Sequence, residues 1–538
     1  MNGRVLSPVR RGSSIGPELR RAEAVLVRDG KVEAIGSGDD VRRSAAAGTE
    51  FVDLRGRAVV PGFIDAHIHP VFYGLSLQGV SCLPPRVASI ADLKREVRTR
   101  VAGAVDAAWI WGQGYDDTRL REGRHPTRDD LDEVSAGLPV VLTRVCGHMC
   151  VANSRALELA GVDASTPDPP GGRIARDASG RPTGLLLETA EDLVLRWISS
   201  KREDVLHALG RVSEDLLRNG VTACCDAWLG YSEGAAEFGI WAEALETGVF
   251  RPGISFLVHH DLWRETLELP DPAQGLDVIG VKLVSDGSIS GGSAGVEEPF
   301  LGDDDRRLLV YDPDELSEIC GDVRSRGLAL AVHAMGDRAI GMALDALERS
   351  RAVTRRGPSG RGGRRVGDRI EHCTLPRRSD IDRMARLGVT PVMQPIFLFA
   401  EGEAYLARLG TRSMWANPAR ALIDAGVRVA MGSDAPATTW GEPTDVMLAI
   451  QTSVTRRTWA GSAMGAGQAT TAAEALIAYT ANAASAAGFG ADRGCLEPGG
   501  RADLVVLSED PTGVPPDAIH HVQVLATVLG GEVVHGEL

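Results

Sequence analysis

The chain has 538 residues, of which 43% are apolar, so it can form a large hydrophobic core and more than one domain. Its net charge of −15, from 73 acidic and 58 basic residues, argues against a surface that binds nucleic acid or anionic membranes. No stretch approaches the roughly 20 apolar residues of a membrane span, and the first residues lack the layout of a signal peptide. We therefore expect a cytoplasmic protein that binds neither nucleic acid nor membranes.

Both ends of the chain contain short apolar runs that are typical of strands. The expected strands cover residues 24–27, 32–36, 502–507, 522–529 and 532–534. Asp29 and Gly30 form a hairpin turn pattern between the first two. We predict one small β-sandwich built from both termini, with residues 1–58 as its N-terminal part and 490–538 as its C-terminal part.

Eight further apolar runs alternate with helical patterns in the middle of the chain. The expected strands cover residues 58–69, 221–226, 254–259, 278–284, 328–333, 369–372, 389–394 and 427–433. The expected helices include residues 203–219, 312–326 and 379–387. Eight strands that alternate with helices predict a (β/α)8 barrel of the TIM type, an α/β fold, over residues 59–489.

Two segments interrupt this alternation. The gap between the first and second strands is far longer than one crossover helix needs, which predicts an inserted subdomain at about residues 75–200 that covers the barrel mouth. The basic, glycine-rich residues 355–365 are expected to form a surface loop. The eight cysteines include no Cys-X-X-Cys pair, so free buried thiols are expected rather than a zinc finger.

The first barrel strand ends in a pattern that suits a metal ion. Because side chains alternate along a strand, Asp65, His67 and His69 share one face. Two neutral imidazoles on one face can bind a single divalent ion such as zinc, iron, nickel or copper. A pair of solvated surface histidines is the alternative for this motif taken alone.

Polar residues also stand at the ends of later strands. Lys282, His333, His372 and Asp434 each follow or end an apolar run. The carboxyl ends of barrel strands meet at one face, where barrel enzymes hold their active sites. These residues together with His67 and His69 therefore predict a metal centre at the barrel mouth.

Lys282 requires a separate explanation, because an ammonium group beside two dications would be strongly repelled. An uncharged amine could react with carbon dioxide and give a carbamate whose two oxygens bridge two metal ions. The alternative is a cationic lysine that pairs with Asp286.

Eight segments together resemble the amidohydrolase superfamily, in particular the branch that contains the N-substituted formamide deformylases. They are residues 61–69 (PGFIDAHIH), 111–116 (WGQGYD), 147–157 (GHMCVANSRAL), 281–288 (VKLVSDGS), 333–339 (HAMGDRA), 369–372 (RIEH), 432–436 (GSDAP) and 498–504 (PGGRADL). Gly500 departs from the pattern, which usually has lysine there. The resemblance covers nearly the whole chain.

The resemblance implies a centre of two divalent ions, expected to be zinc. His67, His69 and Asp434 would bind the more buried ion, His333 and His372 the outer one, and a carboxylated Lys282 would bridge them. Asp434 would act as general base and acid for a metal-bound hydroxide, and His148 in the insertion would donate a hydrogen bond to the substrate, unless it is only structural.

The expected activity is hydrolysis of a non-peptide carbon–nitrogen bond in a small, neutral, partly apolar amide, such as an N-substituted formamide. Three alternatives stay open within the superfamily: a cyclic amide or imide hydrolase, a lactone hydrolase, and a deaminase. A scaffold protein that has lost catalysis is a further alternative. The sandwich and the flank of the barrel could also pair two chains as a homodimer.

Overall fold

The computed structural model describes residues 1–11, 14–84, 86–104, 109–117, 119–145, 149–169, 172–197, 201–230, 234–266, 276–302, 309–353 and 366–538. The predicted basic loop at residues 355–365 lies outside these ranges. The chain forms two compact units. The first consists of Met1–Pro70, Val212–Ala435 and Thr444–Leu538, and the second of Val71–Arg211 and Pro436–Pro443.

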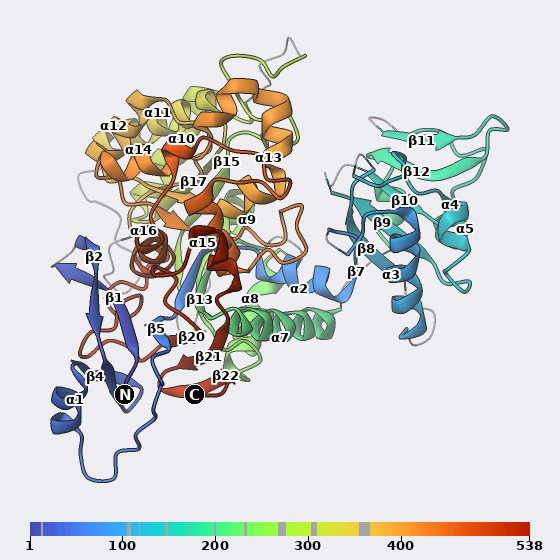
Figure 1. The fold of residues 1–538 in the computed structure, drawn as a ribbon. Coiled ribbons are helices and arrows are strands. Elements are labelled where there is room, and N and C mark those ends of the chain that lie inside the picture. The colour runs from blue at the N-terminus through green and yellow to red at the C-terminus, as the bar shows by residue number, and fades with distance from the viewer. Residues whose placement is uncertain are drawn as a thin grey trace. The chain divides into compact units, whose positions relative to one another are not determined.

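An eight-stranded parallel sheet forms the centre of the first unit, in the order β19-β18-β17-β16-β15-β14-β13-β6 (Figure 1). In chain order its strands are β6 (Phe63–Ile68), β13 (Val221–Leu229), β14 (Gly253–His259), β15 (Val278–Val284), β16 (Ala329–Ala334), β17 (Arg369–His372), β18 (Thr390–Met393) and β19 (Ala430–Met431). The helices that alternate with them include α7 (Arg202–Arg218), α8 (Ala236–Glu246), α9 (His260–Thr266), α10 (Pro313–Ser325), α11 (Asp337–Val353), α12 (Arg378–Leu387), α13 (Pro395–Leu409), α14 (Ala419–Asp424) and α15 (Val446–Thr455). The prediction of a TIM-like barrel is confirmed.

The two ends of this sheet meet at the candidate metal ligands. The Asp434 amide donates a hydrogen bond to the His67 carbonyl (2.7 Å), and the His69 amide donates one to the Ala435 carbonyl (3.0 Å). A Cβ on Gly432 would lie 2.6 Å from the amide nitrogen of His67, so only glycine allows this close approach. The barrel is thus joined between its last and first strands where His67, His69 and Asp434 lie.

Residues from both termini share a second sheet, in the order β2-β1-β5-β20-β21-β22. Its strands are β1 (Arg4–Arg11), β2 (Ser14–Ala22), β5 (Ala58–Pro61), β20 (Leu504–Leu507), β21 (Val524–Leu529) and β22 (Glu532–Gly536). The predicted hairpin forms as β3 (Ala24–Arg28) and β4 (Lys31–Gly36), followed by α1 (Gly38–Ser44). Buried apolar side chains of β1, β5, β20 and β21 pack together with Val32 of β4.

The single strand predicted at residues 58–69 is wrong, because the chain changes sheets at Gly62. Ala58–Pro61 pairs with β1 and β20 in the terminal sheet, whereas Phe63–Ile68 pairs with β13 in the barrel. The Gly62 amide donates to the Asp503 carbonyl, and a Cβ there would lie 2.0 Å from the Thr222 hydroxyl. The uninterrupted apolar pattern gave no indication of this break.

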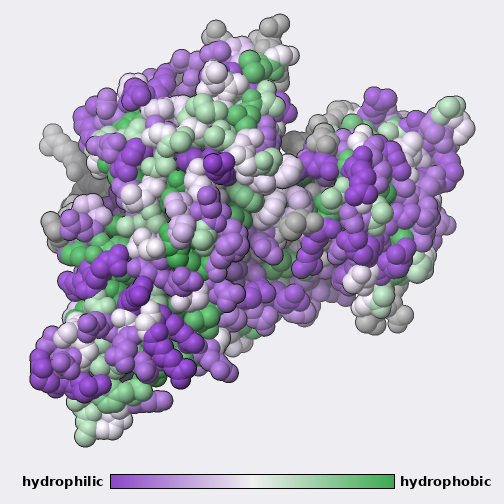
Figure 2. Space-filling view, in the orientation of Figure 1, coloured by the Kyte–Doolittle hydropathy of each residue, from purple (hydrophilic) through white to green (hydrophobic). Residues whose placement is uncertain are grey.

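The second unit contains a six-stranded sheet in the order β11-β12-β10-β9-β8-β7. Its strands are β7 (Val80–Ser81), β8 (Ile110–Tyr115), β9 (Val140–Arg144), β10 (Met149–Ala152), β11 (Gly172–Arg176) and β12 (Pro182–Glu188). The helices α3 (Ile90–Ala102), α4 (Arg128–Asp132) and α5 (Ser154–Ala160) contribute to two apolar clusters within this unit. The face of the unit that Figure 2 shows is mostly hydrophilic.

Two further expectations can be compared with the structure. The seven described cysteines are free and buried, as predicted. In the described ranges, no helix combines the length and apolar character needed to cross a membrane.

Candidate metal centre

His67 ends β6 with its imidazole fully buried and oriented by a carboxylate. Its Nδ1 contacts Oε2 of Glu371 on β17. Arg369 in turn binds both oxygens of Glu371, with Nε 2.7 Å from Oε1 and Nη2 2.9 Å from Oε2. Because Nδ1 is the donor in this contact, the lone pair of His67 lies on Nε2.

The free nitrogen of His67 faces Asp434, which follows β19. Its Nε2 lies 3.2 Å from Oδ1 of Asp434, and Nε2 of His69 lies 2.9 Å from the same oxygen. Nε2 of His67 and Oδ1 of Asp434 are buried, and neither forms a hydrogen bond of good geometry with the described residues. A bound ligand shared by the two atoms would satisfy both of them.

His372 ends β17 beside this pair. Its Nδ1 lies 2.8 Å from Oε1 of Gln394, so Nδ1 donates and Nε2 keeps its lone pair. One donor atom each from His67, His372 and Asp434 lie within 4.8 Å of one another, close enough to take part in one metal centre. His372 and Asp434 also have positive φ angles, 69° and 56°, which L-residues adopt rarely and mostly at functional sites.

His333 on β16 lies next to His372, with a distance of 4.4 Å between ring centroids. Its Nε2 lies 3.2 Å from the Gly287 carbonyl and 3.5 Å from Oδ1 of Asp286. Donation from Nε2 to that carbonyl leaves the lone pair of His333 on Nδ1. His333 is therefore able to act as a ligand beside His372.

Lys282 is buried on β15 and lies close to these groups. Burial lowers the pKa of Lys282, and the negative charges of Glu371 and Asp434 oppose this shift. The charge of Lys282 in turn contributes to the lowered pKa of His69, His333 and His372. Lys282 forms no ion pair with a described residue. The alternative partner, Asp286, instead accepts hydrogen bonds from the amides of Gly295, Met335 and Gly336.

Burial sets the protonation of the imidazoles. It lowers the pKa of His333 to about 3 and the pKa of His372 well below its ordinary value, and it lowers the pKa of His69 as well. Burial raises the pKa of the Asp434 carboxyl, but the neighbouring His67 and His69 outweigh this effect and hold that pKa well below its ordinary value. Neutral His69, His333 and His372 beside an ionised Asp434 are the protonation states that a divalent metal requires.

This donor set fits a divalent metal. Three of the imidazoles have one nitrogen engaged with a protein acceptor and the other free, which is the usual arrangement of metal-binding histidines. Nitrogen and carboxylate ligands of this kind suit zinc and several other transition metals.

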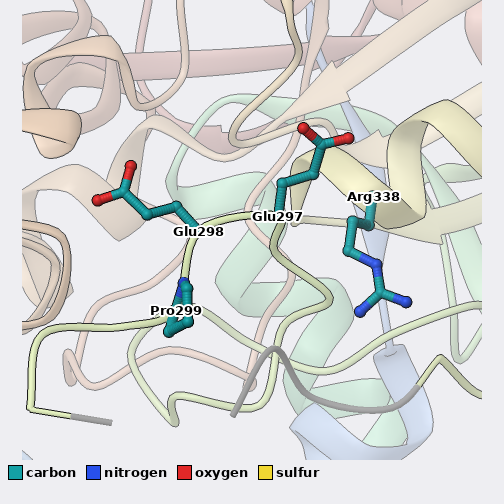
Figure 3. A pocket seen from close by; sticks show the side chains of 4 residues that line it. All are labelled: Glu297, Glu298, Pro299 and Arg338. Atoms are coloured by element: carbon teal, nitrogen blue, oxygen red, sulfur yellow. The ribbon is translucent and has the colours of Figure 1, made fainter. Parts of the chain in front are cut away.

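A pocket of about 430 Å³ lies between the loop that follows β15 and the first turn of α11, and is lined by Glu297, Glu298, Pro299 and Arg338. Figure 3 shows both carboxylates directed away from the Arg338 guanidinium. Glu297 pairs with Arg377 (2.7 Å), and Glu298 lies 3.7 Å from Arg412. These carboxylates are paired with arginines and are not part of the cluster around Asp434.

His148, predicted to contact the substrate, lies outside the described residues. The sequence reasoning did not assign roles to Glu371, Arg369 and Gln394, which orient His67 and His372. Strand periodicity could have indicated the first two, because charged residues at alternate positions of a buried strand need partners within the barrel.

A parallel barrel with imidazoles and a carboxylate gathered at its strand ends defines the class of metal-dependent barrel hydrolases. A crystal structure from Pyrococcus horikoshii, described as an uncharacterized metal-dependent hydrolase, superposes with a TM-score of 0.75 at 26% identity and covers 96% of this chain and 98% of its own. The family model described as "Amidohydrolase family" matches residues 50–535, so the chain belongs to the amidohydrolase family and is a hydrolase of carbon–nitrogen bonds.

Relatives of known name are similar over nearly the full length. The N-substituted formamide deformylase of Arthrobacter pascens is 33% identical over 526 residues, which cover 95% of this chain and 94% of the relative. The protein LONG AFTER FAR-RED 3 of Arabidopsis thaliana is 31% identical, with 95% of this chain and 88% of the relative covered.

Proposed function

We propose that this protein hydrolyses the carbon–nitrogen bond of a small neutral amide and that an N-substituted formamide is its leading substrate. The observation that carries the proposal is the approach of Nε2 of His67 to Oδ1 of Asp434 at 3.2 Å, both buried and without a well-formed hydrogen bond. The similarity to a formamide deformylase along 95% of the chain supports the substrate class.

We assign the ligands as follows. His67, His69 and Asp434 would hold one divalent ion, and His333 and His372 would hold a second. Lys282, as a carbamate on its side-chain nitrogen, would supply oxygen ligands to both. The absence of an ion pair to Lys282 in the described part of the chain supports this assignment, because a buried ammonium without a carboxylate partner is strongly disfavoured. We propose zinc as the metal, since imidazole and carboxylate groups are common zinc ligands.

The chain's own groups then carry the proton transfers. When bound, the metal ions supply a Lewis acid and lower the pKa of a coordinated water to near neutrality. Oδ1 of Asp434 faces His67 and His69, which leaves Oδ2 to accept the proton of the attacking water and to deliver it to the leaving amine nitrogen. Glu371 keeps Nε2 of His67 available as a ligand by holding its Nδ1 proton.

The charge of the barrel interior favours a neutral substrate. The buried Arg369 guanidinium is fully engaged, with Glu371, the Ala66 carbonyl (2.7 Å) and the Ala486 carbonyl (3.2 Å) as acceptors. It is therefore not available to bind a carboxylate or phosphate group of a substrate. An N-alkylformamide carries no such group.

Metal analysis combined with a substrate panel tests the proposal. The purified protein is expected to contain about two zinc ions per chain and to release formate from N-alkylformamides faster than it opens cyclic imides or lactones. His67→Ala is expected to lose metal and turnover together, whereas His207→Ala, at an exposed position of α7, keeps both. A protein that binds no metal, or that hydrolyses none of the amides when fully loaded, would contradict the proposal.

A further inference from the structure

Two aromatic rings lie against each other at the ends of neighbouring barrel strands, next to the candidate metal ligands. Trp228 is the second-last residue of β13 and His259 ends β14, and their rings are stacked with centroids 4.1 Å apart and planes within 7°. Trp228 also contacts His69 edge-on, with centroids 6.3 Å apart. The stacked pair therefore lies at the edge of the cluster that contains His69 and Asp434.

The sheet register directs His259 toward the same interior as Lys282. In the parallel pairing of β14 with β15, His259 is the Cα partner of Lys282. Residues paired in this way direct their side chains to the same face of a sheet. Burial lowers the pKa of His259, and the charge of Lys282 contributes to this shift, in agreement with this closeness.

The backbone fixes which ring nitrogen of His259 carries the proton. The amide of Asp261 donates a hydrogen bond to Nδ1 of His259 at 3.3 Å, so Nδ1 is an acceptor and the proton lies on Nε2. Nε2 has no acceptor among the described residues. The side chain keeps 14% of its surface exposed, so the imidazole is not sealed off from a ligand.

We propose that His259 is a catalytic residue that donates a hydrogen bond from Nε2 to the carbonyl oxygen of the substrate, and that Trp228 is a positioning residue that holds the imidazole plane. The inference rests on the proposed amide hydrolysis. As the amide carbon becomes tetrahedral, negative charge collects on its oxygen, and a donor that is already oriented stabilises that charge without rearrangement. The stacked indole restricts rotation of the imidazole about its Cβ–Cγ bond.

Two substitutions of His259 separate the donor from the ring. His259→Gln keeps an N–H donor near the position of Nε2, whereas His259→Leu removes it. With an N-alkylformamide, His259→Leu is expected to lower kcat about 100-fold with little change in KM, as for the loss of one oxyanion donor. His259→Gln is expected to recover at least about a tenth of the lost rate. Metal content and melting temperature should match those of wild type, and His207→Leu, at an exposed position, should behave as wild type.

Binding of a tetrahedral analogue tests the inference without turnover. An N-alkylphosphonamidate is expected to bind His259→Leu at least about 10-fold more weakly than wild type, with His259→Gln between them. If the wild type binds the analogue but hydrolyses no amide, the proposed substrate is contradicted. The difference in analogue affinity between wild type and His259→Leu can still be measured and still tests the role of His259. Equal affinity of wild type and His259→Leu, no binding to wild type, or loss of metal in His259→Leu would each overturn the role of His259.

Discussion

The carboxylate of Glu371 on β17 accepts a hydrogen bond from Nδ1 of His67 on β6. Arg369 lies two residues before Glu371 and binds both oxygens of the same carboxylate. This chain of contacts connects two strands that lie far apart in the sequence, and it determines which nitrogen of His67 can bind a metal. Its members are buried, so no solvent molecule can replace a lost partner easily.

Glu371→Gln is the first prediction. The amide can no longer balance the buried Arg369 charge or accept strongly from His67, so we expect zinc affinity to fall about 10- to 100-fold. The melting temperature should also fall, because a buried charge without its partner costs several kcal/mol. Competition with a metal chelator measures the affinity. Glu348→Gln is the control, since Glu348 pairs with Arg383 and Arg386 outside the centre; unchanged zinc affinity in Glu371→Gln would contradict the orienting role.

Asp434→Asn tests proton transfer at the centre. An amide in this position keeps the size of the side chain but cannot accept the proton of the attacking water, so kcat is expected to fall at least about 100-fold. Formate release and bound zinc are measured on the same sample, so that loss of metal can be separated from loss of the base. Asp424→Asn, at an exposed position on α14, should retain full rate. Retained turnover in Asp434→Asn would exclude Asp434 as the general base.

The sequence was sufficient to predict the barrel and the polar residues at the ends of its strands. Periodic apolar runs identify strands, and the topology of a barrel brings the ends of distant strands together, so His67, His372 and Asp434 could be expected to meet. The change of sheet at Gly62 was not predictable, because the apolar residues on both sides of it are buried and look alike in the sequence. The feature that marks the break is the close approach of Gly62 to Thr222, which only the folded structure shows. The stacking of Trp228 on His259 was also missed, since it depends on the register of two strands rather than on any local pattern.

Lys282→Ala tests the bridging carbamate. Removal of the bridge is expected to lower the content of the second zinc ion, and added short carboxylic acids should restore part of it, because a carboxylate has the same pair of oxygens as a carbamate. Native mass spectrometry of the loaded wild type should show an extra mass of one carbon dioxide. Lys201→Ala, at an exposed position, should have wild-type zinc content. An unmodified lysine in a fully loaded wild type would refute the carbamate.

The protonation of His259 predicts a pH dependence of stability. Burial lowers its pKa to about 4, below its ordinary value of 6.5. Between these values the unfolded chain binds a proton that the folded protein does not, so His259 makes the protein less stable as the pH falls from 6.5 toward 4. Above pH 6.5 the imidazole is neutral in both states, and its contribution no longer changes with pH.

His259→Gln should therefore remove part of this dependence. The free energy of unfolding of the wild type is expected to rise between pH 4.5 and 6 more steeply than that of the variant, by up to about 1 kcal/mol per pH unit. Urea unfolding of both proteins after metal removal measures the free energy of unfolding at each pH. Other titrating groups, such as Asp65 and Asp286, are present in both proteins, so their contributions cancel when the two slopes are subtracted. Equal slopes would mean that the pKa of His259 is the same in the folded and the unfolded chain.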